Sequence, residues 1–457
     1  MSRISDYLGK SARDNVLAAL AKAKENESYH ALLSLTEARA LERADAVDRG
    51  EITGRLAGVP FVVKDNFLAY GAPTTAASKM LEHFEAPLQA TAVEKLEAEG
   101  AICIGKANLD AFAHGGSTEN SAFGPTLNAH DTTRVAGGSS GGSAVVTALD
   151  IVPFALGSDT GGSIREPASF NGVVGVKPTY GTVSRYGVVA MASSTDTIGT
   201  FVTNASDAAL VMDIMAGKDT KDMTTLDDFF SPVENANPGQ KIGLVKEFMA
   251  DDVDEEVCAR VLDYAQRLRD AGHTVEEVSL PIVHHTLAMY YIIVPAEISS
   301  NLARYDGIRY GRRAEGVATL AELYGKSRDE GFVTENKRRI MIGSYVLSSG
   351  FFDAYYQQAQ RARTLLIREL NTLFETYDVL IGPVAPTPAF LLGENAHDPI
   401  KMYLADIMTV PASLAGIPAL SVPAGETAAG LPVGVQLIGP RRSDAELLAL
   451  AQSMEVN

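Results

Sequence analysis

The stretch RVAGGSSGGSAVVTALDIVPFALGSDTGGSIREPASFNGVVGVKPTYG, residues 134–181, contains two glycine-rich turns that each carry a serine. Ser139 lies in the first turn and Ser163 in the second, and the residues between them have the pattern of a helix followed by an apolar strand. Glycine allows a tight turn with positive φ, so such a turn can direct several N–H groups at one point. The stretch therefore predicts a nucleophilic serine within an α/β fold.

A lysine upstream offers a base for this serine. Lys64 follows the short apolar strand PFVV, residues 60–63, which would carry it into a desolvated interior. Burial lowers the pKa of a lysine, and a neutral lysine can accept a proton. A relay from Ser163 through Ser139 to Lys64 would then cleave amide bonds through an acyl-enzyme without a histidine. Taken alone, however, Lys64 is better explained as an exposed lysine at a strand end, paired with Asp65.

The second turn, DTGGSIR (residues 159–165), follows a strand at its polar end. The backbone N–H groups of Thr160, Gly161, Gly162 and Ser163 are candidates for an oxyanion hole, which needs several donors directed at one oxygen. A plain glycine-rich turn whose serine caps a helix explains the segment equally well.

Two further patterns suggest other chemistry. The run GGSSGGSA, residues 137–144, contains G-x-S-x-G centred on Ser139 and again on Ser140, as in the nucleophile elbow of α/β-hydrolases. That elbow must directly follow a strand, whereas the residues upstream are polar and turn-like. The run GAICIGKA, residues 100–107, approaches a phosphate-binding loop, but its interior is an apolar strand and the final hydroxyl is missing.

The histidines and cysteines predict no metal site. None of the eight histidines is in an H-E-x-x-H pattern, and the two cysteines, Cys103 and Cys258, are too far apart to form a ligand pair. We expect both cysteines to be buried free thiols in a reducing cytoplasm. A Ser-His-Asp triad using His114 or His130 stays open, although no local pattern supports it.

Composition and charge limit which other functions the chain can have. The chain has 457 residues, a formal net charge of -18 and a sequence pI of about 4.9. An acidic surface repels phosphate backbones, so we do not expect this chain to bind nucleic acid by itself. The N-terminus has no apolar signal core, and no apolar run approaches the roughly 18 residues that span a bilayer. We therefore expect a cytoplasmic protein without a membrane segment.

Strand and helix patterns alternate along the chain, which is typical of a mainly parallel or mixed sheet covered by helices. The region 285–376 has an almost wholly helical pattern and suggests a helical insertion in the second half. The polar residues 216–240 form a surface connection. Three other helices are expected at 14–25, 35–49 and 254–271, and strands return in YDVLIGP, PALSVPAG and VGVQLIG.

The spacing of Lys64, Ser139 and Ser163, together with GGSSGGSA and GSDTGGSIREPASFNGVVGVKPTYG, resembles the amidase signature family. The resemblance implies one α/β domain over residues 1–457, with a large mixed sheet covered by helices on both faces. It also implies a Ser-cisSer-Lys triad, in which Ser163 is the nucleophile, Ser139 the bridging serine with a cis backbone, and Lys64 the base. Within this domain we expect catalytic motifs at 60–200, a helical substrate-pocket region at about 285–376, and C-terminal strands and a helix at 377–457.

Further segments are similar to the glutamine-hydrolysing A subunits of tRNA-dependent amidotransferases, a branch of the same family. They are GKANLDAFAHGGSTENSAFGPTLN, VSRYGVVAMASSTDTIG, PAEISSNLARYDGIRYG, KRRIMIGSYVLSSGFFDAYY and DPIKMYLADIMTVPASLAGIPALSVPAG. The resemblance implies that ammonia from glutamine converts Glu-tRNA(Gln), or also Asp-tRNA(Asn), in a heterotrimer with B and C subunits. The B subunit would hold the misacylated tRNA and use ATP and Mg²⁺, so no cofactor is expected in this chain. A stand-alone amidase acting on small amides is the alternative.

A free amino acid as substrate needs a cation for its carboxylate and an anion for its ammonium group. The resemblance suggests Arg339 for the carboxylate, with the adjacent Arg338 equally plausible from sequence, and Asp406 for the ammonium. It also suggests that the pocket is lined by Tyr290 or Tyr291 and by Gly116 and Ser117.

Overall fold

The computed structural model describes residues 1–227, 229–396 and 398–455 of the chain. Within these residues, eleven strands form one sheet in the order β1-β3-β2-β4-β6-β5-β10-β11-β9-β7-β8. The strands are β1 Leu32–Leu35, β2 Pro60–Lys64, β3 Ile102–Ala107, β4 Phe154–Asp159, β5 Val174–Lys177, β6 Thr197–Val202, β7 Lys241–Val245, β8 Thr274–Val278, β9 Val379–Pro383, β10 Ala419–Glu426 and β11 Pro432–Ile438.

The sheet is mixed. Strands β3, β2 and β4 run parallel to one another, as do β9, β7 and β8, and the neighbouring strands between these two groups pair antiparallel. Because β2 and β4 are parallel, their carboxyl ends lie at the same edge of the sheet. This register brings Lys64, the last residue of β2, close to the end of β4.

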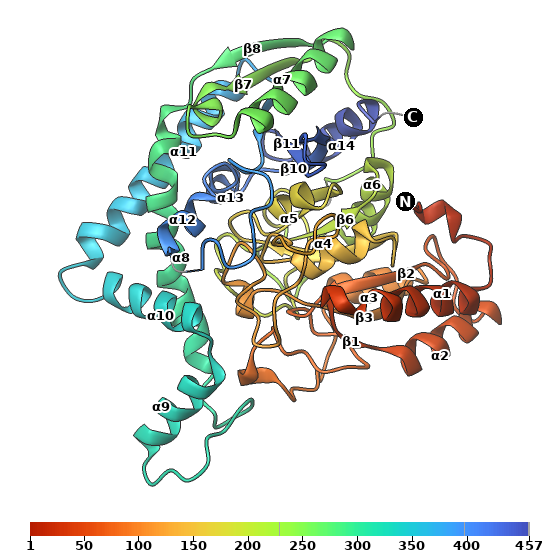
Figure 1. Cartoon of the computed structure of the whole chain (residues 1–457), viewed down its shortest axis with the longest axis vertical. Helices are drawn as coiled ribbons and strands as arrows, with labels where there is room; N and C mark the ends of the chain where they lie inside the picture. The colour runs from red at the N-terminus through yellow and green to blue at the C-terminus, as the bar shows by residue number, and fades with distance from the viewer. Residues whose placement is uncertain (228, 397, 456–457) are drawn as a thin grey trace.

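Helices follow most strands, and Figure 1 shows them packed around the sheet. They are α1 Ala12–Glu25, α2 Glu37–Asp48, α3 Thr91–Ala98, α4 Gly141–Ala148, α5 Arg165–Phe170, α6 Ala205–Met215, α7 Glu255–Asp270, α8 Thr286–Asn301, α9 Leu320–Gly331, α10 Thr334–Val346, α11 Gln358–Phe374, α12 Pro399–Leu404, α13 Val410–Ala415 and α14 Asp444–Ser453.

Alternate residues of β2 pack in two different cores, one on each face of the sheet. Phe61 and Val63 pack in a core shared with residues of α3, α6, α7 and α14. Val62 packs in a second core with residues of α1, α2 and α4. Successive strand residues point to opposite faces, so helices cover both faces, and the expected large mixed sheet of this α/β fold is confirmed.

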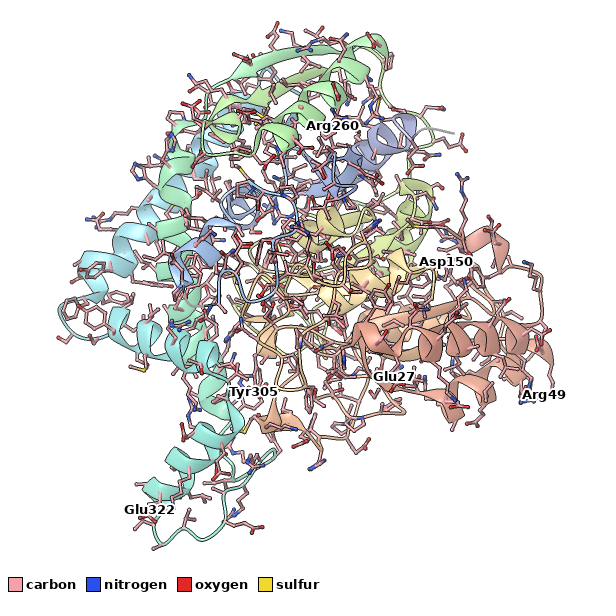
Figure 2. All side chains as sticks on the ribbon, in the orientation of Figure 1. Glu27, Arg49, Asp150, Arg260, Tyr305 and Glu322 are labelled. Atoms are coloured by element: carbon pink, nitrogen blue, oxygen red, sulfur yellow. The ribbon has the colours of Figure 1, made fainter. Side chains whose placement is uncertain are left out.

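The second half of the chain adds a helical layer. Helices α8, α11 and α13 form one core with residues of β9, β10 and β11. In Figure 1, α9 lies at the end of an arm that projects from the body. Figure 2 shows Tyr305 where this arm joins the body and Glu322 near its far end. The region that was expected to be helical thus provides both a covering layer and a projection.

Three expectations about local structure need correction. The helix expected from residue 35 begins at Glu37, because Leu35 is the last residue of β1. The helical region is interrupted between residues 305 and 319, where Gly307, Gly311 and Gly316 adopt positive φ values of 75°, 81° and 63° that suit glycine and end helices. Cys103 is buried as expected, but Cys258 is only partly buried.

Candidate active site

Lys64 is fully buried at the end of β2. Burial lowers its pKa to about 7, against the opposing influence of Asp110, Asp159 and Asp196. Asp65, the expected partner of an exposed lysine, instead forms a buried ion pair with Lys106, at 2.9 Å between Nζ and Oδ1. The interpretation of Lys64 as an exposed, Asp65-paired lysine is therefore wrong, and a substantial fraction of Lys64 is neutral near pH 7.

Ser139 is the direct partner of Lys64. Its Oγ lies 2.8 Å from the Lys64 Nζ, and the Gly138–Ser139 peptide bond is cis. A loop with isolated bridges at Arg134 and Val135 precedes it, and α4 begins at Gly141. Since no strand leads directly into this turn within the described residues, the nucleophile-elbow interpretation does not fit.

Ser163 lies against the turn that carries Ser139. The backbone N–H of Ser140 donates to the carbonyl oxygen of Ser163 at 3.2 Å. Ser163 is nearly buried, and among the described residues its hydroxyl has no hydrogen-bond partner. The structure thus places the three candidate residues at one locus and links two of them, Lys64 and Ser139, by a direct side-chain hydrogen bond.

The turn of Ser163 is held by a carboxylate. Asp159 Oδ2 accepts from the backbone N–H of Ile164 at 3.2 Å, and Asp159 pairs with the fully buried Arg165, which begins α5. The Ser163 hydroxyl caps no helix. Within the described part of the chain, the N–H groups of Gly161, Gly162 and Ser163 have no hydrogen-bond acceptor, which leaves them available to a substrate oxyanion.

Sequence reasoning missed two residues here: Ser158, which contacts the lysine, and Asn66, which contacts Ser158. The Ser158 Oγ lies 3.0 Å from Lys64 Nζ, and the Asn66 Nδ2 donates to the same Ser158 Oγ at 3.0 Å. Ser158 directly precedes the quoted DTGGS motif, and Asn66 lies two residues after Lys64. Their only signal in the sequence is this adjacency to motif residues.

Neither candidate histidine takes part in a serine triad. The ring of His114 is buried, and its Nδ1 lies 2.8 Å from the Asn336 Nδ2. His130 Nε2 contacts the Asn171 carbonyl oxygen at 3.1 Å. The Ser-His-Asp arrangement that the sequence left open is therefore not formed by these residues.

The candidate substrate residues on α10 differ sharply in burial. The side chain of Arg338 is 40% exposed, whereas that of Arg339 is 4% exposed. Both pair with Glu335, and Arg339 does so through its Nε at 2.8 Å. The Arg339 guanidinium also packs over the rings of Tyr291 and Tyr403, at 5.2 and 5.6 Å from their centres. Arg339 is therefore the arginine that faces the interior.

Asp406 lies beside this aromatic pair. Tyr291, whose hydroxyl donates to Asp406 Oδ2 at 3.3 Å, stacks on Tyr403 with ring centres 3.8 Å apart. Burial raises the pKa of Asp406 to about 6, although Arg339 favours its charged form. Arg339 and Asp406 thus provide a buried cation and a partly buried carboxylate in one region.

Glu166 is a third carboxyl group in the same region that the sequence did not reveal. Its Oε2 accepts from the backbone N–H of Gly138 at 3.1 Å. Burial, together with the neighbouring Asp406, raises the pKa of Glu166 well above its usual range.

Three glycines show how close the proposed pocket residues lie to the two serine turns and to the buried carboxyl groups. A Cβ on Gly116 would lie 3.6 Å from Glu166 Oε2 and 3.8 Å from Asp406 Oδ1. A Cβ on Gly138 would lie 2.6 Å from the Ser117 nitrogen, and one on Gly161 would lie 2.7 Å from the Tyr290 hydroxyl. Gly116, Ser117 and Tyr290 therefore border the same space as the candidate nucleophile.

The described residues include neither a cluster suited to a metal ion nor a helix suited to a membrane. Within residues 1–227, 229–396 and 398–455, no three His, Cys, Asp or Glu side chains are grouped so that they could hold a metal ion. In that same part of the chain, no helix combines the length and apolar character required to cross a membrane.

Known proteins are similar to this chain over most of its length. The profile of the amidase family matches residues 14–448. The A subunit of the glutamyl-tRNA(Gln) amidotransferase of Gloeobacter violaceus is 50% identical over 434 residues, covering 93% of this chain and 89% of that protein. The protein of the same name from Lactiplantibacillus plantarum is 49% identical over 460 residues, covering 99% and 94%.

A solved structure gives the same result. The crystal structure of the A subunit of the Thermotoga maritima glutamyl-tRNA(Gln) amidotransferase matches with a TM-score of 0.83 at 40% identity, covering 99% of this chain and 94% of that one. The fold and the sequence relationship define the class: the chain belongs to the amidase signature family. The relatives named here are all A subunits of a tRNA-dependent amidotransferase.

Proposed function

We propose that this chain is the glutaminase subunit of a tRNA-dependent amidotransferase and that its ammonia converts Glu-tRNA(Gln) to Gln-tRNA(Gln). The observation that carries the proposal is the 2.8 Å contact between the buried Lys64 Nζ and the Ser139 Oγ, beside the turn of Ser163. The names of the relatives at about half identity support the choice of reaction.

In the proposed chemistry, neutral Lys64 accepts the proton of Ser139 while Ser139 accepts that of Ser163. The Ser163 Oγ then attacks the carbon of the glutamine side-chain amide. The resulting oxyanion is held by backbone N–H groups of the turn at residues 160–163. Collapse breaks the C–N bond, and the proton on Lys64 returns through Ser139 to the nitrogen, so ammonia leaves. Water cleaves the glutamyl ester by the same relay.

The charges of the pocket suit a free amino acid. Arg339 would bind the glutamine α-carboxylate and Asp406 its ammonium group, because each carries the charge opposite to that of the group it would bind. Tyr290, Gly116 and Ser117 would line the side chain between these anchors and Ser163. Small amides without an amino acid backbone would leave both charged anchors unused.

The proposal includes partners. A B subunit would hold the misacylated tRNA and use ATP and Mg²⁺ to activate the glutamate or aspartate carried by the tRNA, and a C subunit would complete a heterotrimer. The net charge of -18 suits a chain that leaves the tRNA to its partners. We place this assembly in the cytoplasm, where aminoacylated tRNA is used.

The test compares two ammonia sources in the complex reconstituted with the B and C subunits of the same organism. Ser163→Ala should abolish transfer driven by glutamine and leave transfer driven by added ammonium chloride intact. Loss of both reactions would contradict the role of Ser163. Hydrolysis of simple amides by the chain alone, with no response to glutamine or partners, would support the stand-alone amidase instead.

A further inference from the structure

We infer that Ser158, held by Asn66, is a positioning residue that directs the lone pair of Lys64 toward Ser139. The inference rests on the proposed role of Lys64 as the base and extends it to two residues outside the triad. Ser158 belongs to β4, which pairs with the strand of Lys64. Its place in the fold therefore fixes it next to the lysine.

Three oxygen atoms surround the Lys64 Nζ. They are the Ser139 Oγ at 2.8 Å, the Ser158 Oγ at 3.0 Å and the Ser158 carbonyl oxygen at 3.4 Å. An ammonium group has three N–H donors and can satisfy all three oxygens, whereas a neutral amine has two N–H donors and one lone pair. In the neutral state, one of the three oxygens must face the lone pair.

The identity of that oxygen decides whether Lys64 can act as a base. A carbonyl oxygen only accepts hydrogen bonds, so the Ser158 carbonyl cannot donate to the lone pair of Lys64. The hydroxyls of Ser139 and Ser158 remain, and each is able to donate to the lone pair. Lys64 activates Ser163 only if the lone pair faces Ser139.

Asn66 resolves this competition. Its Nδ2 donates to the Ser158 Oγ at 3.0 Å and occupies one of the two lone pairs of that oxygen. The second lone pair then accepts an N–H from Lys64, and the Ser158 hydrogen is turned away from the lysine. The lone pair of Lys64 is left for the hydroxyl of Ser139.

A cavity lined by Asn66 and Ser158 can hold water that accepts a hydrogen bond from the Ser158 hydroxyl. Asn66, Ser158 and Asp196 are among the residues that line a cavity of about 200 Å³. A cavity of this size accommodates several water molecules, each occupying about 30 Å³ in the liquid. The Ser158 hydroxyl can therefore donate into the cavity while its oxygen accepts from Asn66 and Lys64.

The charges around Lys64 come from separate elements and stay unchanged when Ser158 is altered. Asp110 follows β3, Asp159 ends β4 and Asp196 precedes β6, and all three favour the charged lysine. Asp65, the next residue along the chain, is neutralised by its ion pair with Lys106. A changed titration of Lys64 in a Ser158 variant would thus report the lost hydrogen bond.

The experiment measures the rate at which phenylmethanesulfonyl fluoride labels Ser163 in the full chain, as a function of pH. The Ser163 oxygen displaces fluoride at sulfur, and its proton passes through Ser139 to Lys64. The rate should rise with pH to a limit, with a midpoint that reports the deprotonation of Lys64. The reaction needs neither glutamine nor other subunits.

Ser158→Ala should move the midpoint down by about one pH unit, because the ammonium form loses an acceptor. It should also lower the limiting rate about tenfold, because the neutral amine loses the N–H acceptor that orients its lone pair toward Ser139. Ser158→Thr, which keeps the hydroxyl, should restore both. Asn66→Ala should also lower the limiting rate, but should add no further loss to Ser158→Ala, since Asn66 acts through Ser158. Ser143→Ala is the matched control, because its buried hydroxyl bonds the Leu156 carbonyl of β4 without touching Lys64.

The inference is overturned if Ser158→Ala leaves both the limiting rate and the midpoint unchanged. It is also overturned if the double variant shows the full sum of the rate losses from Ser158→Ala and Asn66→Ala. If Ser158→Ala does not fold, an unchanged profile for Asn66→Ala overturns it equally. If the wild-type chain is labelled at Ser163 but does not hydrolyse glutamine with its partners, the proposed substrate is wrong and the positioning role stands.

Discussion

The guanidinium of Arg339 lies 5.2 Å from the ring centre of Tyr291. The hydroxyl of that ring donates to Asp406, so a single aromatic side chain contacts both charged groups proposed to bind glutamine. The separation between the two anchors is thereby set by the ring of Tyr291.

Arg339→Lys should raise the KM for glutamine about 10- to 100-fold with a smaller effect on kcat, because a lysine cannot reproduce a bidentate, ring-stacked guanidinium. Arg338→Lys is the control and should change KM less than about threefold, since that side chain is 40% exposed and a lysine there can still pair with Glu335. Steady-state glutaminase assays of both variants decide the assignment. A larger effect from Arg338→Lys would reverse it.

The pH dependence of glutamine hydrolysis should follow Lys64. Its pKa is lowered by burial to about 7, and only the neutral form accepts a proton. The value of kcat/KM should therefore fall as the pH drops through about 7 and level off above it. Lys64→Met should remove most of the rate, through kcat more than KM. A flat profile between about two pH units below that pKa and two above it would exclude Lys64 as the base.

Gly162→Ala should lower kcat about 100-fold, comparable to the loss of one oxyanion donor. The new methyl group would collide with Thr409 and shift the turn that carries Ser163. Adding Thr409→Ala should recover part of the rate, since it removes the obstructing side chain. Gly325→Ala on α9 is the control, because a Cβ there meets nothing within 4 Å. No recovery in the double variant would argue against this steric cause.

Asp159→Asn should destabilise the fold by about 3–5 kcal/mol, because it leaves Arg165 buried without its charged partner. Asp45→Asn breaks an exposed ion pair with Arg13 and should cost less than about 1 kcal/mol. The chain contains no tryptophan, so urea unfolding is best followed by circular dichroism. Equal costs for the two substitutions would contradict the structural role of Asp159.

The sequence predicts the sheet and the serine turns well because their signals are local. The strand ending at Lys64 is a short apolar run, and both serine turns are marked by glycines within a few residues. β5, Val174–Lys177, and β6, Thr197–Val202, are not among the strands predicted from the sequence. Their place in the sheet comes from pairing with distant strands.

The remaining site residues depend on contacts through space. Ser158 and Asn66 meet Lys64 because β2 and β4 are neighbours, which no local pattern reveals. Arg338 and Arg339 could not be separated, since adjacent residues on a helix point about 100° apart and only packing shows which faces inward. Glu166 pairs with the backbone of a residue in another turn. Such contacts follow from tertiary structure alone.

Lys64, Ser139 and Ser163 come from one continuous third of the chain, while Arg339 and Asp406 lie in connections inserted after β8 and β9. The groups proposed for bond cleavage and the two charged groups proposed to anchor the substrate are thus encoded in separate segments. A new substrate preference can be acquired by replacing whole inter-strand insertions, with the inherited hydrolytic apparatus left untouched. Residues 279–378 and 384–418 are therefore the segments to exchange between proteins of this fold when substrate specificity is to be changed.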